Sequence, residues 1–225
     1  MGVPLLGRVA MGLIGFLGSV RYGFGIYAWH VANRLEKPKY TVVQRLARGV
    51  EVREYEAYNV AEITFKRPDT MKAGTAKGFR GVAGYIFGKN RARGRRAAAL
   101  SEPSEKMAMT APVRTTLKAD EAVAAIDEMK VSFVMARDRE LSSLPVPLES
   151  DVKLRTVPAH RMACRSFSGP PPSQEKIAKL RTVVEGEVEK GGLKRASDEV
   201  LVYGYHDPFI TPNLLRRNEV GVMVA

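Results

Sequence analysis

The chain has 225 residues, of which 45% are hydrophobic and 27% are charged, and its formal net charge is +12. Such a chain is globular and can bury a real core, as one domain or as two small ones, which excludes a disordered protein. Cys164 is the only cysteine, so an internal disulfide and a cysteine-based metal site are also excluded. Because Cys164 lies in a strand-like run, we expect a buried, unreactive thiol rather than a nucleophile.

The first 36 residues are rich in apolar residues and glycine and precede the repeated part of the chain. Val9 to Val20 carries no charge, Arg21 interrupts the run, and Tyr22 to Ala32 is again uncharged. A spanning helix needs about 20 apolar residues, and a central arginine costs about 2.5–3.5 kcal/mol on insertion. We expect residues 1–36 to associate with a membrane, on an unknown side, as an anchor or as an interfacial helix. The alternative is a helix packed on a soluble cytoplasmic domain.

A sixteen-residue stretch occurs twice, as VEVREYEAYNVAEITF (50–65) and as VKLRTVPAHRMACRSF (152–167). The copies align without a gap at an offset of 102 residues (152 − 50 = 102). The identical positions are Val50/Val152, Arg53/Arg155, Ala57/Ala159, Ala61/Ala163 and Phe65/Phe167. Each copy alternates apolar and polar residues around a polar interruption, which predicts two short strands joined by a turn.

A helix is predicted after each copy. After the first copy, a lead rich in glycine, threonine and lysine (67–77) precedes an apolar face that ends at Gly88. The members of this face are Phe79, Val82, Ala83 and Ile86. After the second copy, Ser173 is a good N-cap, and Gly191 and Gly192 end the helix. Its apolar stripe consists of Ile177, Leu180, Val184 and Val188.

Two strand-like runs follow each helix, and one more strand, Tyr40 to Gln44, precedes the first copy. The runs are Met107–Leu117 and Met129–Ala136 in the first half, and Val200–His206 and Asn218–Ala225 in the second. The order strand-strand-helix-strand-strand thus occurs twice, which predicts a duplicated α+β domain. We place this domain at 37–225, with the repeats at about 40–137 and 150–225, closing into one body because neither has enough strands alone. The halves should superpose through a pseudo-twofold axis.

Five blocks of the chain, in order, resemble the SOUL/heme-binding protein family. They are GFRGVAGYIFGKN, KMAMTAPV, VSFVMA, LPVPLESDVKLRTVPAHRMACRSFSG and YHDPFITPNLLRRNEV. The resemblance runs from about Tyr40 to the C-terminus and leaves out the first 36 residues. It implies a fold of duplicated β-α-β-β units that form a distorted antiparallel β-barrel flanked by two helices.

The same resemblance implies a function. Family members bind heme or another porphyrin reversibly as a ligand in an apolar surface groove, and they act in heme carriage or buffering rather than in catalysis. Two alternatives stay open for this chain. One is a heme-processing enzyme that removes the metal or degrades heme. The other is a small-ligand sensor of the gyrase-inhibitor-like type.

The resemblance places the groove between the first helix and the loop before the last strand. The helix wall would be Lys77, Phe79, Arg80, Val82, Ala83 and Ile86, and the loop wall would be Pro208, Phe209, Ile210, Leu214, Leu215 and Arg216. Lys77, Arg80 and Arg216 are the candidates to pair with two propionates. Some members carry a histidine directly after the repeat's arginine as an iron ligand, but this chain has Glu54 there.

His206 borders the apolar loop and is therefore the candidate heme-iron ligand, although a turn histidine bonded to local backbone fits equally well. His160 is expected to face solvent. No spacing of histidine, cysteine or acidic residues predicts a protein-only metal site, and no catalytic constellation is recognisable. Arg216 and Arg217 could pair with Glu219 or with a propionate.

The basic run KNRARGRR (89–96) overlaps the start of the loop 91–105. No aromatic residue is interleaved with these arginines, so we expect a solvated loop and no nucleic-acid partner. The expected partner is a tetrapyrrole, together with a membrane surface through residues 1–36. The sequence leaves the oligomeric state open.

Overall fold

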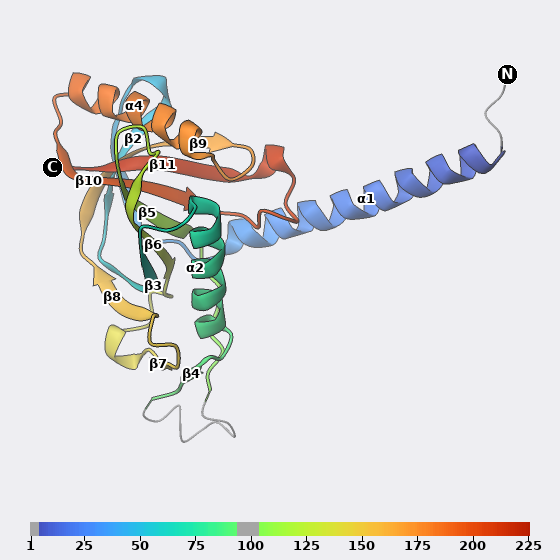
Figure 1. Ribbon diagram of the computed structural model, residues 1–225, viewed down its shortest axis with the longest axis horizontal. Helices are drawn as coiled ribbons and strands as arrows, with labels where there is room; N and C mark the ends of the chain where they lie inside the picture. The colour runs from blue at the N-terminus through green and yellow to red at the C-terminus, as the bar shows by residue number, and fades with distance from the viewer. Residues whose placement is uncertain (1–4, 94–103) are drawn as a thin grey trace.

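The structure is a computed structural model that describes residues 5–93 and 104–225, with side chains from Val20 onward. Two helices lie against a curled sheet, and a long N-terminal helix projects away from this body (Figure 1). The helices are α1 (Leu5–Arg34), α2 (Met71–Ile86) and α4 (Gln174–Lys190). Most of the predicted basic loop falls at 94–103, outside the described residues.

The strands are short, and three 3₁₀ turns connect some of them. The strands of the first half are β1 (Tyr40–Arg45), β2 (Val50–Tyr55), β3 (Tyr58–Lys66), β4 (Asn90–Arg91), β5 (Val113–Ala119) and β6 (Ile126–Val134). Those of the second half are β7 (Val146–Pro147), β8 (Lys153–Val157), β9 (His160–Ser168), β10 (Arg195–Gly204) and β11 (Arg217–Val224). The 3₁₀ turns are η1 (Ala47–Gly49), η2 (Leu141–Ser143) and η3 (Asn213–Leu215).

The main sheet is antiparallel throughout, in the order β1-β2-β9-β11-β10-β5-β6-β3-β8, and β4 pairs with β7 separately. Apart from β1, this order is symmetric about the β10–β5 contact. The halves also exchange their outer strands. β2 of the first half lies beside β9 of the second, and β8 of the second half lies beside β3 of the first.

The register of the exchanged strands confirms the repeat. Tyr55 pairs with His160 between β2 and β9, and Val157 pairs with Tyr58 between β8 and β3. Both equivalences use the same offset as the sequence copies (157 − 55 = 102 and 160 − 58 = 102). The turns 56–57 and 158–159 correspond as well. The predicted α+β fold of duplicated units flanked by two helices is confirmed, and the predicted distorted antiparallel β-barrel is an antiparallel sheet curled into a half-barrel.

The helices α2 and α4 cover the same face of the sheet. Alternate residues of each strand point to that face and form the core with the two helices. Val82 and Ile86 of α2 pack on Ala61 and Phe133, and in α4 the corresponding core residue is Val184, which packs on the β9–β11 half. Burying one such aliphatic side chain stabilises the fold by about 1.5–3 kcal/mol. The opposite, helix-free face curls inward and carries its own cluster, rich in tyrosine.

The helix α2 begins earlier than the apolar spacing predicted. It starts at Met71 because the Thr70 side chain accepts the N–H of Ala73 at 3.1 Å and caps the first turn. The part of the predicted lead from Met71 onward is therefore helix. Its Gly78 faces the sheet, where an added Cβ would meet the side chain of Val131, so a glycine here allows close packing. In α4, the predicted Ser173 cap is confirmed.

The strand predicted at Met107–Leu117 begins only at Val113. The Met107 N–H donates to the Ile86 carbonyl at the end of α2, and the Ala111 N–H donates to Glu36 after α1. These bonds occupy the backbone before Val113, so the segment connects the helices to the sheet instead of joining a ladder. Met107 also packs against the α2 cluster, as the core interpretation expected.

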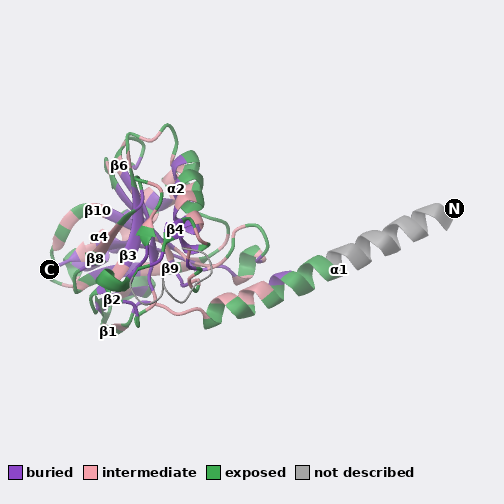
Figure 2. Cartoon of the chain, turned by 90° about the horizontal axis from the view of Figure 1, so that it is seen from below, coloured by how far each residue is buried: buried purple, intermediate pink, exposed green. Residues whose placement is uncertain are grey.

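The helix α1 leaves the body as a projecting rod, and side chains in its described part are mostly exposed (Figure 2). Its C-terminal end is held by the last loop of the chain. An added Cβ at Gly25 would meet Pro212, and Asn33 contacts His206. Among the residues that the structure describes, no helix has the length and apolar character needed to cross a membrane. Membrane association stays a prediction.

Candidate functional site

The predicted helix wall does not form one surface. Val82, Ala83 and Ile86 are buried against the sheet, with exposed fractions of 0, 8 and 0%. Phe79 is 37% exposed, and Lys77 and Arg80 are exposed. Only these three outer residues are accessible to a ligand on the surface of α2 as it stands.

Lys77 and Phe79 lie on opposite flanks of α2, since residues two apart on a helix differ by about 200° around its axis. The Lys77 ammonium lies 5.7 Å from the centre of the Phe65 ring on β3. Phe79 instead contacts Phe133 on β6, with ring centroids 5.2 Å apart. The strand β5 lies on the other side of β6 from β3. Arg80 is about 100° around the helix axis from Phe79 and Lys77 about 160°, so Arg80 is the nearer cation to Phe79.

An apolar strip continues from Phe79 across the sheet. Phe133 pairs with Val113 of β5, and Val113 pairs with Gly204 of β10. Val113 and Gly204 are half-buried. We use the term apolar strip for Phe79, Phe133, Val113 and Gly204. The strip ends where β10 ends, so it joins α2 to the start of the 205–216 loop, the two walls that the sequence predicted.

Gly204 leaves the strip open at its end. A Cβ built there would meet no atom within 4 Å. Tyr203 and Tyr205 point to the helix-free face, so position 204 faces the helices and the strip. The sequence-based site omitted Gly204 and Val113. The alternation Tyr-Gly-Tyr was the available signal, because it places one glycine on the opposite face from two large aromatic residues.

The predicted loop wall lies mainly against α1. The side chains of Phe209 and Leu214 are 81% and 83% exposed, and Arg216 is 9% exposed. A cavity of about 270 Å³ lies between the loop and α1, and its lining includes Phe209, Ile210, Leu214, Arg216, Arg21 and Tyr22. Pro208 and Leu215 are half-buried. The loop residues are thus gathered together, with α1 as the facing wall of this cavity.

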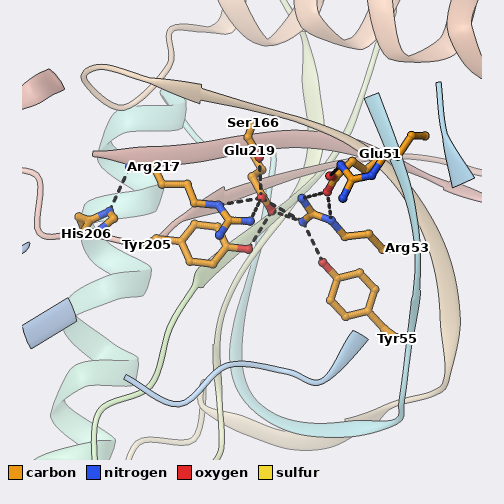
Figure 3. A network of polar contacts seen from close by, with 9 residues as sticks. Glu51, Arg53, Tyr55, Ser166, Tyr205, His206, Arg217 and Glu219 are labelled. Atoms are coloured by element: carbon orange, nitrogen blue, oxygen red, sulfur yellow. Dashed lines mark hydrogen bonds and ion pairs between the residues drawn. The ribbon is translucent and has the colours of Figure 1, made fainter. Parts of the chain in front are cut away.

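His206 has both ring nitrogens in contacts. Its Nδ1 accepts the backbone N–H of Arg217 at 3.0 Å, as Figure 3 shows, and its Nε2 lies 3.3 Å from Oδ1 of Asn33 on α1. Burial lowers the pKa of His206, and the nearby charges of Lys37, Arg217 and Arg216 lower it further. A neutral ring that accepts at Nδ1 carries its proton at Nε2. This tautomer leaves neither nitrogen ready to bind iron.

A polar network on the helix-free face is centred on Glu219, which is 0% exposed (Figure 3). Arg53 donates to both carboxylate oxygens at 3.0 Å, and Arg217 donates at 3.0 and 2.6 Å. The hydroxyls of Ser166 and Tyr205 add bonds of 2.8 Å each. Burial alone would raise the pKa of Glu219, but the two arginines and the hydrogen bonds lower it overall. The predicted pairing of Arg217 with Glu219 is confirmed.

Arg155, the repeat counterpart of Arg53, also pairs with a buried carboxylate, here on the neighbouring strand β3. Arg155 donates to Glu62 twice at 2.8 Å, and Ser132 donates to the same carboxylate at 2.6 Å. Burial would raise the pKa of Glu62, and these bonds lower it overall. Both carboxylates are buried on the helix-free face, the opposite face of the sheet from the strip. We assign them to the stability of the curled sheet.

Two other sequence expectations concern possible ligands. His160 does not face solvent, because its ring stacks on Tyr55 at 5.1 Å and its Nδ1 lies 2.8 Å from the Pro158 carbonyl. Glu54 is 3.6 Å from Arg161 at the surface. Within the described part of the chain, no three His, Cys, Asp or Glu side chains are placed to hold a metal ion.

Comparison with protein families gives one match, which is described as SOUL heme-binding protein and covers residues 35–223. The comparison with curated proteins gives no significant match. Among solved structures, a hydrolase from Listeria innocua is 14% identical, with 80% of this chain and 93% of that chain covered and a TM-score of 0.53.

Two further solved structures have a similar fold. An uncharacterised conserved protein from Listeria innocua is 13% identical, with 79% and 93% of the two chains covered and a TM-score of 0.54. The EcmrR chain of an EcmrR–DNA complex is 12% identical, with 99% of this chain and 72% of that chain covered and a TM-score of 0.52. At such identities the likeness shows a shared fold and nothing about activity.

Proposed function

Because the chain belongs to the SOUL heme-binding protein family, we propose that it binds heme or a related tetrapyrrole reversibly on the apolar strip beside α2. The proposed role is carriage or buffering of the tetrapyrrole, without turnover. The observation that carries this placement is the open end of the strip at Gly204, across β5 from the exposed ring of Phe79.

The accessible members of the strip, Phe79, Val113 and Gly204, would contact one face of a tetrapyrrole macrocycle, while Phe133 is 1% exposed beneath Phe79. Phe79 offers an aromatic ring, and Val113 and the bare backbone at Gly204 allow a flat ligand to approach the sheet closely. Burial of apolar surface contributes about 25 cal/mol per Å² before the costs of association. A ligand held mainly in this way on an open surface dissociates readily, which supports a carrier rather than a permanent cofactor site.

The charged groups near the strip would orient the propionates. Arg80 is exposed on α2 next to Phe79 in sequence, and an arginine can bind a carboxylate through two parallel hydrogen bonds. Lys77 leans towards β3, on the other flank of the helix. We therefore propose Arg80 as the principal propionate partner and give Lys77 a smaller role.

Iron ligation by His206 is not part of the proposed binding mode. Its Nδ1 accepts the Arg217 N–H, and the proton on Nε2 points to Asn33. Ligation would require the loss of at least one of these contacts. Metal-free porphyrin should therefore bind nearly as tightly as heme, because the apolar contacts are the same for both.

The test is a pair of absorbance titrations, with hemin and with protoporphyrin, on the wild type and on Phe79→Asp and His206→Ala. We expect similar affinities for the two ligands, little effect of His206→Ala, and at least tenfold weaker binding by Phe79→Asp, because a carboxylate replaces an apolar contact. Leu148→Asp is the matched control, since Leu148 is 60% exposed and lies outside the strip.

Two results would contradict the proposal. If Leu148→Asp weakens binding as much as Phe79→Asp, the ligand is not on the strip. If hemin binds a hundredfold more tightly than protoporphyrin and the difference vanishes in His206→Ala, iron ligation governs the site. Time-dependent loss of the Soret band with release of metal-free porphyrin would instead favour the heme-processing enzyme.

A further inference from the structure

The cavity between α1 and the 205–216 loop is separate from the apolar strip and has a different chemistry. It measures about 270 Å³, and two arginines line it, Arg21 from α1 and Arg216 from the loop. The Arg216 Nε donates to the Thr211 carbonyl at 2.6 Å, which fixes the guanidinium at the cavity wall. Two cations around a small space favour an anionic group that can accept several hydrogen bonds.

Thr211 gives a second, independent indication of a ligand. It lines the cavity and is 1% exposed. Nowhere in the described part of the chain does its hydroxyl oxygen find a hydrogen-bond partner. A buried hydroxyl without a partner costs free energy and is uncommon in native structures. The hydroxyl is covered while the cavity is empty, so a turn of the Thr211 side chain would let an anion in the cavity accept its proton, and the arginine N–H groups would donate to the same anion.

The rim of the cavity is apolar and strongly exposed. Phe209 and Leu214 have exposed fractions of 81% and 83%, and Tyr22 of α1 is 59% exposed. The Asp207 carboxylate accepts the backbone N–H of Phe209 at 2.7 Å, which stiffens the loop where the phenylalanine projects. Large apolar side chains that project from a stiffened loop around a cationic cavity fit a membrane surface better than water.

We propose that this cavity binds the phosphate of an anionic phospholipid while its rim residues enter the apolar layer of the bilayer. The net charge of +12 adds general attraction to an anionic surface. The volume supports a headgroup, because it lies below the range of about 300–1,000 Å³ that is typical for sites of drug-sized ligands. This site would attach the chain to a membrane by the loop and α1 together, and it does not depend on tetrapyrrole binding.

The experiment is sedimentation of the full-length, tetrapyrrole-free protein with phosphatidylcholine vesicles, with and without added phosphatidylglycerol. We expect binding that requires phosphatidylglycerol. Arg21→Gln should weaken the partition about fivefold, as expected for one cation near an anionic surface. Leu214→Asp should weaken it about tenfold, because an apolar group that enters the bilayer is lost. Thr211→Val, which keeps the shape of the side chain, should reduce the preference for phosphatidylglycerol.

The controls change the same residue types outside the cavity. Lys118→Gln removes one exposed cation, and Leu148→Asp adds one acid in place of an exposed leucine. Both should bind vesicles as the wild type does. Equal weakening by Arg21→Gln and Lys118→Gln would overturn the site and leave diffuse attraction only. An unchanged lipid preference in Thr211→Val would also overturn it, as would binding of soluble glycerol phosphate, seen at the Thr211 amide by NMR, without vesicle binding.

Discussion

Arg53 on β2 and Glu219 on β11 form a buried ion pair across the exchanged strand β9, with Nη1 3.0 Å from each carboxylate oxygen. Their side chains are 2% and 0% exposed. Arg53 also donates to Glu51 at 2.8 and 3.0 Å. The pair therefore links a strand of the first half to the last strand of the second half inside the curled face.

Removing the carboxylate should destabilise the fold strongly. Glu219→Ala leaves the buried Arg53 charge with Glu51 as its remaining carboxylate partner, and breaking such a buried pair typically costs about 3–5 kcal/mol in the free energy of unfolding. The measurement is urea unfolding followed by circular dichroism. Glu54→Ala is the control, because Glu54 lies 3.6 Å from Arg161 at the surface. Its loss should cost less than about 1 kcal/mol. Equal effects of the two substitutions would mean that the buried pair contributes little.

The same carboxylate should make stability fall in acid. The pKa of Glu219 is lowered overall in the folded state, so its ionised form contributes stability above the unfolded pKa of about 4.3. This contribution is lost as the pH falls through the lower, folded pKa. We expect the free energy of unfolding of the wild type to decline more steeply below about pH 4.3 than that of Glu219→Gln. Parallel pH profiles would contradict the assigned shift.

A larger side chain at Gly204 should weaken tetrapyrrole binding without lowering the stability of the fold. Gly204→Val places a branched side chain where a Cβ meets no atom within 4 Å, so the fold should keep its stability or gain up to about 1 kcal/mol. Tetrapyrrole affinity should fall about tenfold, because the new side chain occupies the ligand's place. Gly186→Ala in α4 is the control, since position 186 is equally open. Unchanged affinity in Gly204→Val would remove Gly204 from the site.

Cys164 should react slowly in the folded protein. It is 1% exposed, burial raises the pKa of its thiol, and the Glu219 carboxylate raises it further. A disulfide reagent such as Ellman's should modify it only as the fold opens, and should titrate one thiol at once in denaturant. Ser142→Cys, at an exposed position, provides a fast-reacting thiol in the same chain. Rapid reaction of native wild type would show that the strand opens locally.

Local signals were sufficient to predict most elements and the repeat. Alternation predicted the strand pairs around the turns 56–57 and 158–159, and the hydroxyl of Ser173 caps α4 as its position before the helix suggested. Such features depend on neighbours in sequence. The early start of α2 was missed because Gly74 and Gly78 resemble a flexible lead, whereas in the fold they allow the helix to approach the sheet closely.

The long-range features could not be predicted in this way. No local pattern shows that β2 pairs with β9 and β8 with β3. The two halves have the same apolar alternation, so pairing a strand within its own half would bury the same face as pairing it with the other half. The predicted site had a related weakness. Positions two residues apart, such as Lys77 and Phe79, were assigned to one wall, although the turn of α2 places them on opposite flanks. The contact between α1 and the last loop joins the two ends of the chain, and only the fold shows it.

The exchange of outer strands also has a consequence during synthesis of the chain. Val50 in β2 pairs with Arg165 in β9, 115 residues later (165 − 50 = 115). At about 5–20 residues per second, a ribosome needs on the order of ten seconds to make that partner. Throughout this interval one edge of β2 has no mate and can pair with the wrong chain. A nascent chain of this topology should therefore depend on holding chaperones, and a truncated first half should self-associate through that edge.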